Sequence, residues 1–123
     1  MEVWQKLQIK PDMTLAVLNA PADGPDLSGP LEVATDAESA AAVIVFVKDR
    51  AEVGSQGSRG VRAALEDRLV WFAYPKAKKL GTDLNRDILA KELIARGVDP
   101  VRQVSLDDVW SALRFRPAFR DAR

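Results

Sequence analysis

The residues best suited to bind a ligand follow the second of two strongly apolar segments. Leu69–Tyr74 is apolar, Pro75 ends it, and a lysine-bearing loop leads to a later helix. In sheets built from alternating strands and helices, groups just past the carboxyl ends of the strands face the ligand crevice. Ammonium groups attract anions there, and a guanidinium offers a planar fork to a carboxylate or phosphate. We therefore predict a site for a small anionic, nucleotide-like ligand. Its candidate residues are Tyr74, Lys76, Thr82, Asp83, Asn85 and Arg86.

Most of these residues also have a purely structural explanation. Thr82, Asp83 or Asn85 can cap the start of the following helix, because their side chains accept from free backbone N–H groups. Arg86 can pair within the chain, with Asp83 or with Asp87. Whether Asp83 and Arg86 face a crevice or each other is open at the level of sequence.

Other polar clusters are interpreted structurally. Lys78 and Lys79 are expected to be solvated, and Asp107-Asp108 is typical of a turn whose side chains bond to local backbone. The glycine-serine run 54–60 lacks the Gly-Lys-Ser/Thr ending of a phosphate loop and predicts a flexible crossover. The tryptophans at positions 4, 71 and 110 are expected in the core, although Trp110 on an edge strand would suit an interface.

The chain contains no cysteine and no histidine. Disulfides, thiolate nucleophiles, Cys/His zinc sites and an imidazole base are therefore excluded. A metal would have to be a hard cation held by carboxylates, and a general base would have to be Asp, Glu, Lys or Tyr. We assign no catalytic residue, no metal site and no cofactor, and we favour a non-enzymatic protein.

The composition is that of one ordinary globular domain. Of 123 residues, 47% are hydrophobic and 29% are charged, with zero net charge. We expect one domain over residues 1–117 and a tail over 118–123. No apolar run is long enough to cross a bilayer, and the N-terminus lacks the features of a signal peptide, so we expect a cytoplasmic protein. Residues 1–60 carry a net charge of −4 and residues 61–123 a net charge of +4, a split too weak to indicate nucleic-acid binding.

Apolar runs, caps and breakers predict the order of elements. Segments 42–47 and 69–74 are apolar at nearly every position, which is typical of interior strands covered on both faces. The predicted strands are 14–18, 31–35, 42–47, 69–74, 101–106 and 110–116, the last two forming an antiparallel hairpin. The predicted helices are 2–8, one or two turns at 37–41, one turn near 50–53, then 58–67 and 82–96. This order predicts an α/β fold with a mainly parallel sheet and a C-terminal antiparallel hairpin.

The segment Ile9–Leu18 resembles the lead-in to the first strand of class I S-adenosylmethionine-dependent methyltransferases. Tyr74-Pro75-Lys76, Thr82–Asp87 and Pro100–Pro117 resemble a bacterial family of small domains of unknown function. The resemblance implies a reduced Rossmann, methyltransferase-like three-layer sandwich, and it implies no activity.

The departure from the methyltransferase pattern bears on function. Where that family has a Gly-x-Gly turn after the first strand, this chain has Asn19-Ala20-Pro21. Side chains occupy the glycine positions, and the prolines remove the helix whose N-terminus would face the cofactor. We therefore predict a module that binds a small anion or a protein partner. The alternatives are a small transferase with an altered cofactor pocket, and a homodimer that pairs through the C-terminal hairpin.

Overall fold

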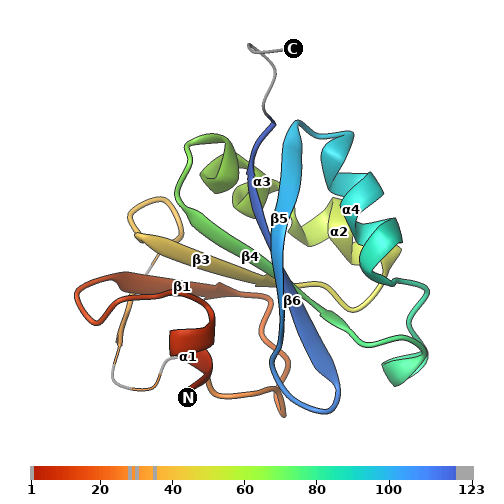
Figure 1. Ribbon diagram of the computed structural model, residues 1–123, viewed down its shortest axis with the longest axis horizontal. Helices are drawn as coiled ribbons and strands as arrows, with labels where there is room; N and C mark the ends of the chain where they lie inside the picture. Colours follow the sequence, from red (N-terminus) through yellow and green to blue (C-terminus); the bar gives the residue numbers. More distant parts are fainter. Residues whose placement is uncertain (1, 28, 30, 35, 119–123) are drawn as a thin grey trace.

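The computed structural model describes residues 2–27, 29, 31–34 and 36–118 (Figure 1). The described part of the chain contains a six-stranded sheet and four α-helices. The strands are β1 (Thr14–Leu18), β2 (Glu32–Val33), β3 (Ala42–Phe46), β4 (Leu69–Pro75), β5 (Val98–Ser105) and β6 (Trp110–Pro117). The helices are α1 (Val3–Lys6), α2 (Arg50–Gln56), α3 (Ser58–Leu65), α4 (Arg86–Ile94) and the short 3₁₀ turn η1 (Lys79–Gly81).

The sheet has the strand order β2-β1-β3-β4-β6-β5. The first four strands in that order are parallel. In the hairpin, β6 is antiparallel to both β4 and β5, so β5 runs in the same direction as the first four strands. Every residue of β3 and β4 is buried, which confirms the prediction of two interior strands. The α/β class, the mainly parallel sheet and the antiparallel hairpin are confirmed.

Two hydrophobic cores lie on opposite faces of the sheet. One face is covered by α2, α3 and α4 (Figure 1), and Phe72, Leu89 and Leu93 are fully buried there. The other face is covered by α1 and by extended segments that contribute Leu27 and Leu31. The third layer predicted from the resemblance is therefore one helical turn and irregular chain, because the prolines after β1 exclude a long helix.

The crossover from β3 to β4 is helical where a flexible break was expected. Helix α2 runs to Gln56 and α3 begins at Ser58, so only Gly57 separates them. The helix expected over 58–67 is present as α3, but the expected break before it is reduced to Gly57. Val53 of α2 is buried and Gly57 lies close to Phe72 of β4, so tertiary packing outweighs the cost of about 1 kcal/mol for a helical glycine.

The short helix expected at 37–41 does not form; this segment consists of bends. The Arg68 guanidinium donates to the carbonyl oxygens of Ala37 (2.5 Å) and Ala40 (2.8 Å). Those oxygens thus accept from a side chain that immediately precedes β4. Ser39 N donates to Asp36 Oδ1 at 2.8 Å, which completes a turn.

The remaining boundaries follow the expectations with small differences. Helix α4 begins at Arg86, four residues later than expected. Asp107 Oδ1 accepts from the backbone N–H groups of Val109 (2.8 Å) and Trp110 (2.7 Å), which confirms the turn interpretation. Thr35 and residues 119–123 of the expected tail lie outside the described residues. No helix in the described part of the chain is long and apolar enough to cross a membrane.

Candidate functional site

A small pocket lies beyond the carboxyl end of β4, and we call it the loop pocket. Its volume is about 210 Å³, and four of the six predicted site residues line it. The lining residues are Tyr74, Lys76, Ala77, Asn85, Arg86, Gln103 and Ser111. Strand β4 and its loop provide the first three, the start of α4 the next two, and the hairpin the last two. Two of these side chains are cationic, and none of the described lining residues is acidic.

Tyr74 forms the buried wall of the loop pocket. It is 3% exposed, and its hydroxyl accepts from Gln103 Nε2 at 3.1 Å. Burial raises the pKa of Tyr74 above its usual value, while Arg86 and a hydrogen bond with Ser111 oppose that rise. Tyr74 therefore stays a neutral phenol at physiological pH.

The two cations are held differently. Lys76 Nζ donates to Ser105 Oγ at 2.8 Å, and its backbone N–H donates to Val109 O at 2.7 Å, which ties the loop to the hairpin. Arg86 Nη1 lies 3.3 Å from Asp87 Oδ1, and the Asp87 side chain is 90% exposed. An exposed ion pair of this kind contributes at most about 1 kcal/mol. The pair therefore holds Arg86 only weakly.

Asn85 is the N-cap of α4. Its side-chain oxygen accepts from Ile88 N at 2.8 Å, and its backbone is extended, as N-cap residues are. The structure thus selects Asn85 among the three caps that the sequence left open.

Thr82 and Asp83 face the neighbouring loop after β3 and are not among the residues that line the loop pocket. Thr82 Oγ1 donates to Lys48 O at 2.6 Å, and Arg50 N donates to Asp83 Oδ1 at 2.8 Å. Asp83 therefore caps the first turn of α2 from outside its own segment, and the pair Asp83–Arg86 does not form. Thr82 and Asp83 therefore anchor the loop after β4 to the loop after β3.

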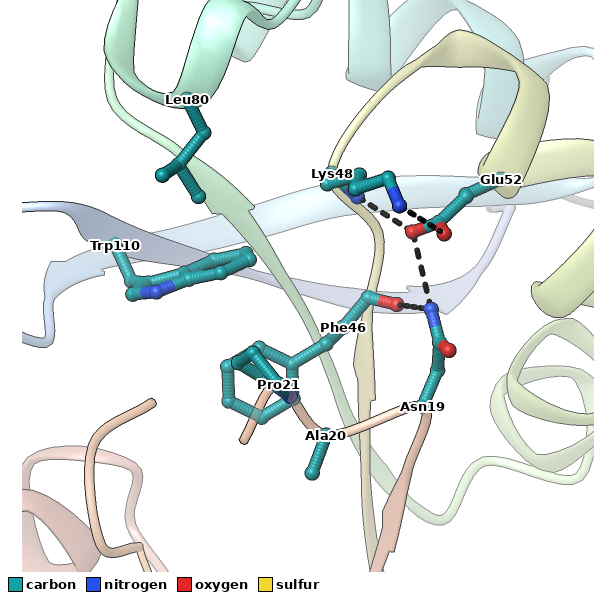
Figure 2. Close-up of a pocket in the computed structure, with 8 residues that line it drawn as sticks. All are labelled: Asn19, Ala20, Pro21, Phe46, Lys48, Glu52, Leu80 and Trp110. Atoms are coloured by element: carbon teal, nitrogen blue, oxygen red, sulfur yellow. Dashed lines mark hydrogen bonds and ion pairs between the residues drawn. The ribbon is translucent and has the colours of Figure 1, made fainter. Parts of the chain in front are cut away.

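A second pocket lies where the carboxyl ends of β1 and β3 meet, and we call it the crevice (Figure 2). The chain leaves β1 toward β2 on one side and returns to β3 on the other, so the strand order reverses at this point. Ligands of open α/β sheets bind at such reversals. The crevice has a volume of about 160 Å³ and is lined by Asn19, Ala20, Pro21, Phe46, Lys48, Glu52, Leu80 and Trp110.

One corner of the crevice is polar (Figure 2). Glu52 Oε1 accepts from Asn19 Nδ2 at 3.0 Å and from Lys48 N at 2.9 Å, and Lys48 Nζ lies 3.5 Å from Glu52 Oε2. Asn19 Nδ2 also donates to Phe46 O at 2.8 Å. Asn19 has φ 57°, a left-handed conformation that asparagine tolerates better than most residues. The Asn19 side chain thus joins the ends of β1 and β3.

The other walls of the crevice are apolar. Phe46 and Trp110 meet edge to face, with ring centroids 5.0 Å apart and an angle of 81°. They come from strands on either side of β4 and meet on one face of the sheet, where Ala73 and Ala112 are their small neighbours. Leu80 extends from the loop after β4 and is 63% exposed.

The sequence argument missed the crevice as a site. Asn19 and Lys48 each follow a predicted strand directly, and this position alone could have marked them as candidate site residues. Trp110 carried no such signal, because its approach to Phe46 depends on the place of β6 beside β4. No group of three or more metal-ligating side chains occurs among the residues that the structure describes.

Comparisons with known proteins identify no relative. The chain matches no protein-family model, no curated protein and no solved structure. The class that the structure defines is a mixed α/β protein with a mainly parallel six-stranded sheet.

Proposed function

We propose that this protein binds a small anionic ligand in the loop pocket without transforming it. The observation that carries the proposal is the pairing of Lys76 and Arg86 on one pocket of about 210 Å³ whose described lining contains no acid. Two positive charges on a shared pocket favour the entry of an anion. A guanidinium and an ammonium together suit a carboxylate or phosphate group.

Neutral groups of the loop pocket supply orientation. Tyr74, Gln103 and Ser111 place a phenol, an amide and a hydroxyl on one side of it. Ligand sites typically combine a few such polar groups with apolar walls. The raised pKa of Tyr74 keeps its proton in place, so this group donates or accepts hydrogen bonds and does not act as a base at neutral pH.

The first experiment measures thermal stability of the pure protein against inorganic phosphate, citrate and nucleoside monophosphates. A ligand present at about a hundred times its dissociation constant adds about 2.7 kcal/mol, which corresponds to a rise of about 10 °C in melting temperature for a chain of this size. We expect Arg86→Gln and Lys76→Gln each to weaken binding at least about tenfold, because each removes one charge-assisted hydrogen bond.

Lys79→Gln is the matched control. It removes the same charge from the same loop, at a residue that does not line the pocket. If Lys79→Gln weakens binding as much as Arg86→Gln does, the anion responds to general surface charge and the proposal fails. It also fails if no anion in the panel changes the melting temperature.

Tyr74 offers an independent readout because it is the single tyrosine of the chain. Its ionisation can be followed by absorbance at high pH without interference from another tyrosine. A bound anion disfavours the phenolate, so phosphate is expected to raise the pKa of Tyr74 further. Arg86→Gln should itself raise that pKa, since Arg86 lowers it, and should remove the effect of phosphate.

The methyltransferase-like ancestry of the fold belongs to this proposal. The strand order β2-β1-β3-β4-β6-β5, in which β6 alone runs against the other described strands, supports it. The crevice at the reversal of strand order favours the alternative of a small transferase, whereas Asn19 and Pro21 in place of a glycine turn oppose it. S-adenosylmethionine belongs in the stability panel for this reason. A rise in melting temperature with that compound would favour the transferase.

Homodimerisation through the hairpin stays a prediction. Strand β5 is the edge of the sheet, and it contains Pro100, an irregularity between Pro100 and Arg102, and an exposed arginine at 102. Natural edge strands use these features to prevent pairing. Trp110, expected at such an interface, is 5% exposed and forms a wall of the crevice. Sedimentation at several protein concentrations would test the dimer directly.

A further inference from the structure

The crevice has the size of one six-membered ring. Its volume is about 160 Å³, and an apolar cavity of roughly 150 Å³ in another protein accommodates benzene. Two of its walls are aromatic, Phe46 and Trp110, and Pro21 is a further apolar residue of the lining (Figure 2). Aromatic walls favour a planar ring, which can stack or approach edge to face.

The polar corner of the crevice presents a donor beside an acceptor. Lys48 Nζ and Glu52 Oε2 lie 3.5 Å apart at one end of the crevice. Glu52 Oε1 accepts from Asn19 Nδ2 and Lys48 N, and these bonds also fix the position of the second carboxylate oxygen, Oε2. An ammonium next to a carboxylate oxygen is complementary to an O=C–N–H group, whose oxygen accepts and whose N–H donates.

The loop after β4 provides a partial cover for the crevice. Leu80 lies above it (Figure 2), is 63% exposed and has φ 55°, in the left-handed region that leucine rarely occupies. The hydrogen bond from Thr82 Oγ1 to Lys48 O anchors this loop to Lys48, one of the residues of the polar corner. A large apolar side chain held in a disfavoured conformation over a pocket gains contacts when a ring fills the space beneath it.

We propose that the crevice is a second binding site, specific for a small neutral aromatic or heteroaromatic ring that carries an amide group. The ring lies between Trp110 and Pro21 under Leu80, and the amide meets Lys48 and Glu52. This site is separate from the loop pocket: the two share no lining residue, and they select different chemistry.

Three neutral probes separate the parts of this proposal. Benzamide contains the ring and the complete amide, N,N-dimethylbenzamide lacks the amide hydrogens, and cyclohexanecarboxamide lacks the planar ring. Binding is measured by titration of the Trp110 indole N–H signal in a nitrogen–proton NMR spectrum. We expect benzamide to shift this signal and to bind at least about tenfold more tightly than either analogue.

Variants at exposed positions test the site without unfolding the protein. Leu80→Ala and Lys48→Gln should each weaken benzamide binding several-fold, while Val101→Ala, an exposed apolar residue on β5, should leave it unchanged. Arg86→Gln should also leave it unchanged, which distinguishes this site from the proposed anion site. Equal affinity for the three probes, or no shift of the Trp110 signal, would overturn the proposal. So would benzamide binding that is unaffected by both Leu80→Ala and Lys48→Gln.

Discussion

Two helical glycines in the crossover provide a sharp test of how α3 packs on the sheet. A Cβ added at Gly60 of α3 would lie 2.6 Å from Val45 Cγ2 and 2.9 Å from Phe72 Cζ. Val45 and Phe72 are fully buried in β3 and β4, so neither can move aside freely. A Cβ added at Gly54 of α2 would meet only Arg96 Nη2 within 4 Å, at 3.7 Å.

The two Gly→Ala substitutions should therefore have opposite effects. Alanine in a helix is favoured over glycine by about 1 kcal/mol, and Gly54→Ala should gain about that amount. Gly60→Ala gains the same propensity but forces a methyl group into a packed core, which costs about 1–3 kcal/mol. We expect its net effect to be a loss of about 1 kcal/mol, so the two variants should differ by about 2 kcal/mol.

Urea unfolding followed by tryptophan fluorescence measures both free energies of unfolding. The slope with denaturant should be the same for the two variants and the wild type, since the surface exposed on unfolding is unchanged. Gly60→Ala equal to or more stable than Gly54→Ala would refute the close packing of α3 on β3 and β4. A segment that is flexible in both the folded and the unfolded state gains little from alanine. An unchanged free energy of unfolding in Gly54→Ala would therefore favour the flexible break expected from the sequence.

Three further predictions concern the loop after β4 and two titrating groups. Thr82→Val removes the hydrogen bond that Thr82 Oγ1 donates to Lys48 O and the one that it accepts from Leu84 N, and it should lower the free energy of unfolding by about 1–2 kcal/mol in urea. An unchanged value would mean that the two bonds contribute nothing. The hydrogen bond with Arg116 holds the pKa of Asp67 below its usual range. The stabilisation of the fold by this bond is therefore present above the unfolded pKa of Asp67 and is lost as pH falls through its folded pKa. NMR titration should show this low pKa in the wild type and its rise in Arg116→Gln. Burial raises the pKa of Tyr74. The contribution of the neutral Tyr74 phenol to the free energy of unfolding is therefore present below about pH 10 and is lost as pH rises through the folded pKa. The difference in free energy of unfolding between wild type and Tyr74→Phe should shrink over that interval.

Local sequence determined the strands well because their signal is physical and short-ranged. Residues 42–46 and 69–75 are apolar at nearly every position, and such a run must be buried on both faces wherever it lies in the sheet. The helix start at Asn85 was one of three caps that the sequence allowed. The choice among them depends on Lys48 and Arg50, which bind Thr82 and Asp83 from 33 or more residues away.

The arrangement of the candidate site required knowledge of neighbours across the sheet. The prediction placed Lys76 and Arg86 near the carboxyl end of β4, and the loop pocket brings them together. It did not identify Gln103 or Ser111 as the opposite wall, since that wall depends on β6 pairing with β4. The same pairing brings Trp110 to Phe46 and so creates the crevice. The residues that the prediction missed are therefore those whose position depends on the order of the strands, because no local sequence pattern encodes that order.

The loop between β4 and α4 is the structural element common to both proposed sites. Lys76 near its start lines the loop pocket, and Leu80 at its centre covers the crevice. Lys78 and Leu80 of this loop both have positive φ. Thr82 then fixes the end of the turn to the loop after β3. A loop anchored in this way can hold an anion-binding cation on one side and an apolar cover on the other, each in a fixed place. The segment thus has two parts: Lys76, Leu80, Asn85 and Arg86 line the two proposed sites, and Thr82 and Asp83 anchor the loop that holds them.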